Sequence, residues 1–187
     1  MRGKGILIFC FIMLMISGVA YGGGFWLEVK GMYFQPKDQN FKHIYGNGSY
    51  RDWMCYGGEM GITIFKGVAI WAGGHYFNKR GKLTFTKEET EMTIMPIYGG
   101  IKFRSSRAGI NPYIGIGVGY FRYKEDNPIG SVEDKSIGYI GQAGLTLKIG
   151  VAIIDFQISY TLCKVKPTDI EADLGGFYGG IGIGFEL

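Results

Sequence analysis

The stretch that decides the fold is GVAIIDFQISYTLCK, residues 150–164. Every second residue in it is bulky and apolar, in the order Ile154, Phe156, Ile158, Tyr160 and Leu162. The residues between them are polar or small, namely Asp155, Gln157, Ser159, Thr161 and Cys163. A period of two puts all the bulky groups on one face of a β-strand, whereas a helix would spread them around its circumference. The stretch therefore predicts a strand with one apolar and one polar face.

Seven further segments have the same strand character. Five alternate clearly, and two are apolar but less regular. The regular ones are residues 27–33, 60–64, 114–120, 137–148 and 177–187, and the less regular ones are residues 68–78 and 91–103. Pro96 predicts a bulge or a locally weakened ladder, because proline has no backbone N–H group to donate. The sequence thus predicts eight strands.

The spacing of these strands is typical of a membrane barrel. Extended to the connections on either side, the expected strands run for about 11 to 13 residues, which is the length that a tilted strand needs to cross a bilayer. Short turns at 66–67, 104–109 and 148–150 alternate with long polar connections at 37–53, 78–90, 124–135 and 164–174. We therefore predict an all-β fold, an eight-stranded antiparallel up-and-down transmembrane β-barrel. The short turns are expected to face the periplasm with Lys66, Arg104, Arg107 and Lys148, and the long connections to face outward.

The first residues have the three zones of a secretory signal. Arg2 and Lys4 precede an apolar run over residues 6–16, and small residues follow over residues 17–22. The run is shorter than the roughly 20 residues that a membrane-spanning helix needs. We therefore expect a cleaved signal peptide at residues 1–22 and an outer-membrane β-barrel domain at residues 23–187.

The composition agrees with a single glycine-rich β domain. The 187 residues include 33 glycines, and 47% are hydrophobic and 16% aromatic. The formal net charge is +4, and two of those charges belong to Arg2 and Lys4 in the leader. The charge therefore gives no indication of nucleic-acid binding.

Two neighbouring segments resemble those of a known family. The stretch MPIYGGIKF, residues 95–103, is followed by NPYIGIGVGY, residues 111–120. A short turn ending in Pro-Tyr that opens a glycine-alternating strand resembles the central hairpin of the bacterial outer-membrane protein β-barrel domain family, the small OmpA-like and OmpX-like barrels. The last strand is similar to their assembly signal, carried here by Phe177, Ile181, Ile183, Phe185 and Leu187, although that signal usually ends in Phe or Trp. The resemblance implies periplasmic chaperones and barrel-insertion machinery as partners.

The polar strand faces are expected to line the lumen, because eight strands enclose a space just wide enough for side chains. Alternation places a polar network there, made of Glu28, Lys30, Glu59, Lys102, Gln142, Asp155, Gln157 and Glu186, with Lys148 and Tyr178 on the same faces. Buried charges need partners. Lys30 is therefore expected to pair with Glu59, or failing that with Asp155 or Glu28. A gated ion or proton path along these groups is the open alternative.

Few residues suit catalysis or metal binding. His43 is expected in a loop and His75 at the outward rim, and neither has a carboxylate at a ligand spacing. No serine lies close to His75, as an acyl-transfer site would require. The sequence predicts no catalytic, cofactor or metal site and no enzyme. Cys55 and Cys163 are expected at the rim, three strands apart and pointing inward, so we expect two free thiols.

These features predict an integral protein of the outer membrane with a structural or surface-interaction role, such as envelope integrity or adhesion. Its lumen is expected to be filled by side chains, without an open pore. Its expected partners are outer-membrane lipids and lipopolysaccharide, and it is expected to be a monomer. The alternative is a narrow transporter or channel for small hydrophobic molecules, which an apolar upper lumen and a gap in the wall would favour. A soluble barrel with its apolar face inside is the alternative fold.

Overall fold

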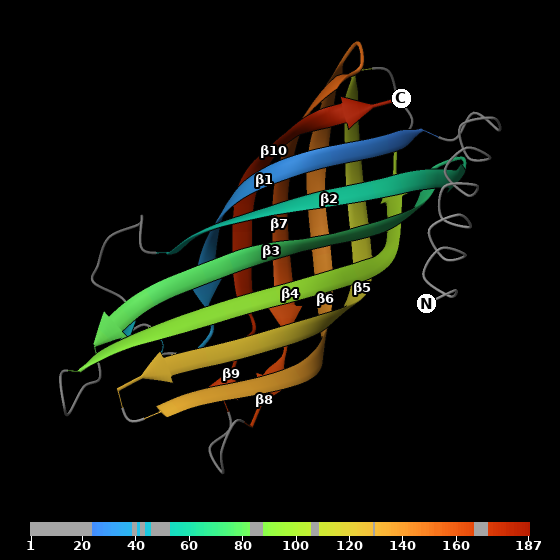
Figure 1. The fold of residues 1–187 in the computed structure, drawn as a ribbon. Helices are drawn as coiled ribbons and strands as arrows, with labels where there is room; N and C mark the ends of the chain where they lie inside the picture. Colours follow the sequence, from blue (N-terminus) through green and yellow to red (C-terminus); the bar gives the residue numbers. More distant parts are fainter. Residues whose placement is uncertain are drawn as a thin grey trace, which may run out of the picture.

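The chain forms a closed barrel of eight strands (Figure 1). The structure, a computed structural model, describes residues 24–38, 41, 44–45, 53–82, 88–105, 109–128, 130–166 and 172–187. The barrel strands are β1 (Phe25–Pro36), β2 (Met54–Phe65), β3 (Val68–Lys82), β4 (Glu89–Arg104), β5 (Ile110–Asn127), β6 (Gly130–Ile149), β7 (Ala152–Leu162) and β10 (Gly176–Glu186). The predicted eight-stranded antiparallel barrel is confirmed. The expected signal peptide, His43 and Arg107 lie outside the described residues.

The first and last strands close the barrel. β1 pairs antiparallel with β10, from Trp26 opposite Glu186 to Pro36 opposite Gly176. Beyond this ladder the Phe25 N–H donates to the Leu187 carbonyl oxygen at 3.2 Å, and the Leu187 N–H donates to the Phe25 carbonyl oxygen at 2.9 Å. Every other barrel strand pairs with the strands before and after it in the sequence, so β1 and β10 form the seam.

Short turns gather at one end of the barrel, here called the turn end. β2 and β3 are joined there by Lys66 and Gly67, and β6 and β7 by Gly150 and Val151. Gly67, Gly109 and Gly150 have φ angles of 82°, 89° and 64°. Side chains other than that of glycine rarely adopt these angles, so the glycines allow the tight reversals. The opposite end, which carries the longer connections, is called the loop end.

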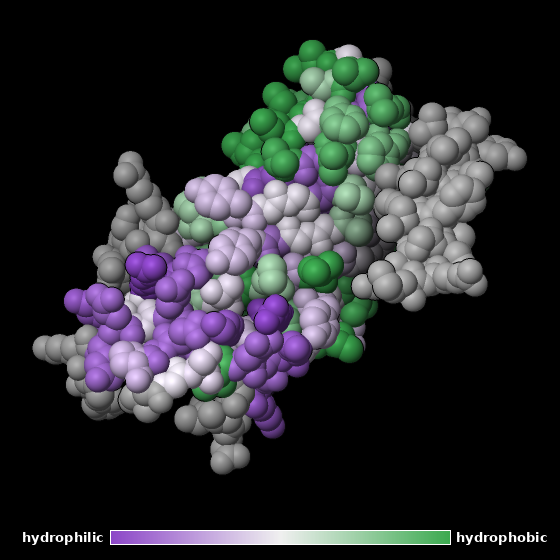
Figure 2. All heavy atoms as spheres, in the orientation of Figure 1, coloured by the Kyte–Doolittle hydropathy of each residue, from purple (hydrophilic) through white to green (hydrophobic). Residues whose placement is uncertain are grey.

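The two faces of each strand differ as the alternation predicts. Val29, Ile116, Ile158 and Ile183 point outward and are exposed. Their neighbours Glu28, Gln157, Ser159 and Gly182 are buried in the lumen. Hydrophobic residues cover the turn end of the face shown in Figure 2, and hydrophilic residues cover its loop end. The apolar outer face is thus arranged for lipid rather than for water.

One segment that the sequence predicts as a loop forms the ends of two paired strands instead. The sequence predicts a long connection over residues 124–135, but β5 continues to Asn127 and β6 begins at Gly130. Asn127 Oδ1 accepts a hydrogen bond from the Gly130 N–H at 3.0 Å, which fixes the tight turn between them. The charged residues that indicate a loop lie instead on the β5–β6 ladder, where it continues past the apolar part of the outer face. The expected loop at 164–174 also holds a short hairpin of β8 (Lys164–Val165) and β9 (Ala172–Asp173).

The ladder between β3 and β4 lapses at Pro96. Pairing runs up to Gly74 opposite Ile97 and resumes at Phe77 opposite Ile94 in the same register. Of the two expected effects, a weakened ladder is therefore present and a bulge is not, because proline donates no hydrogen bond but still fits an extended chain. Among the described residues, no helix is both long and apolar enough to cross a membrane.

Close contact between β4 and β5 depends on a residue without a side chain. A Cβ atom added at Gly100 would overlap the carbonyl oxygen of Ile116 and lie 2.6 Å from the Cα of Gly117. We predict that Gly100→Ala lowers the free energy of unfolding by about 1 to 3 kcal/mol, because the backbones must separate. Chemical denaturation in detergent micelles measures this. Gly141→Ala is the control, since no heavy atom lies within 4 Å of its added Cβ. Equal stability of the two variants would contradict the close contact.

Candidate functional site

The lumen at mid-height holds a cluster of buried charges. Lys30 on β1 points into it and is surrounded by carboxylates from three strands. Its Nζ lies 3.1 Å from Glu28 Oε1, 3.3 Å from Glu59 Oε2 and 3.1 Å from Asp155 Oδ2. It also donates to Gln157 Oε1. The structure therefore brings Lys30 together with all three of the carboxylates between which the sequence leaves the choice open.

A second lysine shares Glu59 with Lys30. Lys102 on β4 contacts Glu59 Oε1 through its Nζ. The same ammonium lies 4.1 Å from the ring centre of Tyr113, 5.4 Å from that of Trp26 and 5.7 Å from that of Trp71. Aromatic faces attract cations most strongly where water is excluded. This aromatic surround thus helps to hold the buried charge of Lys102.

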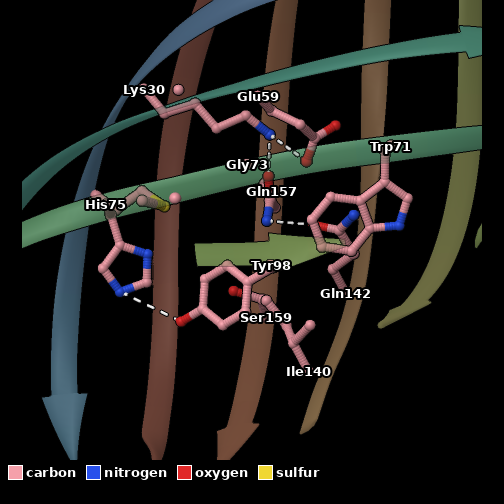
Figure 3. A pocket seen from close by; sticks show the side chains of 13 residues that line it. Lys30, Glu59, Trp71, Gly73, His75, Tyr98, Ile140, Gln142, Gln157 and Ser159 are labelled. Carbon is pink, nitrogen blue, oxygen red and sulfur yellow. Dashed lines mark hydrogen bonds and ion pairs between the residues drawn. The ribbon is translucent and has the colours of Figure 1, made fainter. Parts of the chain in front are cut away.

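Neutral groups satisfy the remaining oxygens. Tyr113 donates its hydroxyl to Asp155 Oδ2 at 2.9 Å, and Thr146 donates to Asp155 Oδ1 at 3.2 Å. Gln157 donates to Gln142 at 2.7 Å. Two ammonium groups and three carboxyl groups therefore share one network, which Figure 3 shows in part. A network of this kind is rigid while complete, and it is costly to break because the freed charges stay buried.

Glu186 lies apart from this network, although the sequence groups it with the others. It sits at the turn end, where Arg104 Nη2 contacts its Oε2 at 2.7 Å and Lys148 Nζ lies 3.6 Å from its Oε1. Arg104 also lies over the Trp26 ring at 4.5 Å. The turn end thus has an ion pair of its own.

Above the charges, towards the loop end, the lumen turns aromatic. A cavity of about 20 Å³, enough for about one water molecule, separates the two regions. His75 and Tyr98 line it and point toward one another, with His75 Nε2 and the Tyr98 hydroxyl 3.5 Å apart (Figure 3). The expectation of a rim position for His75 is wrong: the residue is buried, because β3 continues past it to Lys82.

A cluster of buried rings lies in the outer half of the lumen and is here called the aromatic plug. Phe34 stacks on Tyr178 with 4.4 Å between ring centres and meets Phe77 edge-on at 5.4 Å. Trp53 stacks on Phe77 at 5.7 Å. Alternation places Tyr178 on an inner face, but it does not assign Phe77, because Phe77 lies on a strand whose two faces are both apolar or small. Cys55 and Cys163 are buried in the same cluster as free thiols.

Several solved structures have a shape similar to this barrel. OprG of Pseudomonas aeruginosa has a TM-score of 0.67 and 14% identity, over 88% of this chain and 96% of that one. Neisserial surface protein A has a TM-score of 0.58 and 11% identity, over 88% and 96%. Ail of Yersinia pestis, in complex with the heparin analogue sucrose octasulfate, has a TM-score of 0.56 and 11% identity, over 88% and 97%. No family profile and no curated protein sequence matches the chain.

The chain has the fold of the small eight-stranded outer-membrane barrels.

In this barrel, the five residues of the expected assembly signal share one face. Phe177, Ile181, Ile183, Phe185 and Leu187 all point outward and are exposed. The first four lie on β10, the strand that closes on β1, and Leu187 follows directly after it. Their role in insertion stays a prediction.

The barrel shows no constellation that points to metal chemistry. Within the described part of the chain, no group of three His, Cys, Asp or Glu side chains lies close enough to hold a metal ion.

Proposed function

We propose that the chain is an integral outer-membrane barrel, with its turn end in the periplasm, that acts through the surface which it carries outside the membrane. The observation that supports this most directly is a sheet that continues beyond the barrel. β3, β4, β5 and β6 extend past the loop end of the other strands (Figure 1). β2 reaches only to Tyr76 along β3, and β7 reaches only to Tyr139 along β6. We call the part of these four strands beyond Tyr76 and Tyr139 the projecting sheet.

The outer face of the projecting sheet is charged and ordered by ion pairs. Arg122 Nε donates to Glu133 at 2.9 Å, and Arg80 Nε donates to Glu91 at 3.2 Å. Hydrogen bonds from Asn78 lower the pKa of Glu91, as those from Arg122 lower the pKa of Glu133. Both carboxylates thus keep their charge in mildly acidic surroundings. Figure 2 shows hydrophilic residues gathered at this end of the molecule.

The inner face of the projecting sheet is apolar and covered. Met92, Ile94, Phe121 and Tyr123 are buried there. Tyr45, from the connection between β1 and β2, packs against them and shares a 3.3 Å hydrogen bond with Thr90. The sheet is therefore a stiff platform, which suits contact with a surface polymer better than a flexible loop would. A lumen filled by ion pairs and rings supports a structural or adhesive role without an open pore.

Expression in the outer membrane of a host bacterium tests the proposal. Trypsin added to intact cells should cut in the long connections at the loop end, for example within residues 37–53, and leave Lys66 and Arg104 uncut. Cells with the protein should adhere to surfaces coated with heparin or collagen at least fivefold better than cells with a variant that lacks residues 124–133. Cleavage at Lys66 in sealed cells, or equal adhesion by both strains, would contradict it.

A transport role for small apolar molecules is the second candidate. The interruption of the β3–β4 ladder at Pro96 supports a transport role, because this interruption lies beside His75 and Tyr98 at the base of the aromatic plug. A passage there would need the plug to move, since its rings are buried against one another. Uptake of a small apolar dye by vesicles that hold the wild-type barrel separates the two roles. Uptake no faster than in empty vesicles is the result expected of a closed barrel.

A further inference from the structure

The outward face of β4, β5, β6 and β7 carries an apolar groove. One hollow of about 640 Å³ lies over these strands and is lined by Gly99, Val118, Tyr139 and Leu162, among others. A second hollow of about 320 Å³ continues it towards Phe177 on β10. Ile116, Gly141 and Tyr160 line both hollows. The two hollows therefore form one groove.

Gly141 is the floor of the groove, and the strand itself does not require glycine there. Its backbone neighbours across the ladders are Ile116 on one side and Tyr160 on the other. A Cβ added at Gly141 would have no heavy atom within 4 Å. The walls stand two strand spacings apart, about 10 Å. That width admits an extended hydrocarbon chain between two large side chains.

Positive charge lies beyond the groove, towards the loop end, on β5 and β6. Arg122 on β5 pairs directly with Lys135 on β6, four residues beyond Val118 and Tyr139 and roughly 13 Å further along the strands. Like charges in directly opposite positions destabilise a sheet. Glu133 contacts both, at 2.9 Å from Arg122 and 3.5 Å from Lys135. The three groups, two cations and one carboxylate, therefore carry a net charge of +1.

An aromatic residue separates the charges from the groove. Tyr120 points outward between the two levels, Tyr139 lines the near edge of the groove, and both are exposed. Tyrosine is enriched where the hydrocarbon of a bilayer meets its headgroups. Cation, tyrosine and apolar groove thus follow one another in the order of a lipid's phosphate, its ester region and its acyl chains.

We propose that this face binds one acylated lipid of the outer leaflet that carries a phosphate on its headgroup. An acyl chain lies in the groove over Gly141, and the phosphate contacts Arg122 and Lys135. A guanidinium group has five N–H donors that suit phosphate oxygens. Two nitrogens of Arg122 already donate to Glu133, so the remaining N–H groups of Arg122 contact the phosphate together with Lys135. The inference rests on the proposed function, because β4 to β7 must face the bilayer.

Native mass spectrometry of the refolded barrel in detergent with lipid A tests the groove. Wild type should retain one lipid per protein, and Gly141→Leu should reduce the retained fraction at least tenfold by filling the groove. Gly31→Leu is the matched control: Gly31 is an outward glycine on β1, its added Cβ would also have no heavy atom within 4 Å, and it does not line the groove. Equal retention by Gly141→Leu and Gly31→Leu would overturn the proposal. A mass of two chains that Gly141→Leu reduces to one would assign the groove to a second copy instead, and would also overturn it.

The phosphate contact is tested by comparing lipid A with its dephosphorylated form. Wild type should favour lipid A at least tenfold, and Arg122→Gln with Lys135→Gln should abolish the preference. Arg80→Gln, which removes an exposed ion pair with Glu91 away from the groove, should keep it. No preference in wild type would overturn the headgroup assignment. Insertion of wild type into lipid vesicles, followed by protease protection, tests the membrane location separately, so that failure of either proposal is recognised.

Discussion

Replacing Lys30 by methionine should lower the free energy of unfolding by about 3 to 5 kcal/mol, because it leaves buried carboxylates without their partner. The Lys30 side chain is 4% exposed and that of Asp155 is 1% exposed, so water does little to compensate. Urea unfolding in lipid vesicles, followed by circular dichroism, measures the loss. Lys37→Met is the control. Lys37 pairs with Asp173 at the loop end, where it is half exposed, so this substitution should leave the urea midpoint of unfolding unchanged.

The contacts also indicate which second substitution restores stability. Without Lys30, Glu59 keeps Lys102 and Trp26, and Asp155 keeps Tyr113 and Thr146. Within the described part of the chain, Glu28 has Lys30 as its ion-pair partner. The double variant Lys30→Met with Glu28→Gln should therefore recover a large part of the lost stability. It should recover more than Lys30→Met with Glu59→Gln, because the latter leaves Lys102 without its carboxylate partner. A double variant no more stable than Lys30→Met would contradict this arrangement, and ion conductance in Lys30→Met would make the network a gate.

Phe34→Ala should cost about 3 to 5 kcal/mol, since Phe34 is fully buried at the centre of the aromatic plug and the neighbouring rings cannot fill its volume. Phe103→Ala, on the outer face with 51% exposure, should cost much less. Denaturant unfolding compares the two variants. The same proteins in vesicles report on transport: if the plug closes the lumen, Phe34→Ala should speed entry of a small apolar dye and Phe103→Ala should not. Equal stability of the two variants would show that the plug is not packed as described.

Strand number and facing could be predicted from the sequence because alternation is a local property. Glu28 and Lys30 alternate with Leu27 and Val29. Within the membrane, a polar face can avoid contact with lipid only by pointing into the lumen. The outer ends of the strands could not be predicted in this way. Lys124 to Asp126 are charged enough to indicate a loop, yet outside the hydrocarbon a strand carries charge on either face, and cross-strand ion pairs stabilise it.

The contents of the lumen were predictable in part for the same reason. Alternation places the polar groups inside, and closure of the barrel then decides their partners. It does not reveal the whole aromatic plug, because Phe77 lies on a strand with the apolar Ile70 and Tyr76 on its other face. With apolar groups on both faces, the period of two carries no information about which face is inside.

The seam between β1 and β10 has a consequence for the order of assembly. Hairpins such as β5–β6 join residues close together in the chain, so they form at a small entropic cost, whereas the seam joins the two ends of the described chain and closes last. Until then each end strand has an open edge that can pair with another molecule. The growing barrel is thus most vulnerable to aggregation just before completion, and mutations that weaken the Phe25 to Leu187 seam should speed unfolding more than they slow folding, because contacts that form last are missing from the folding transition state.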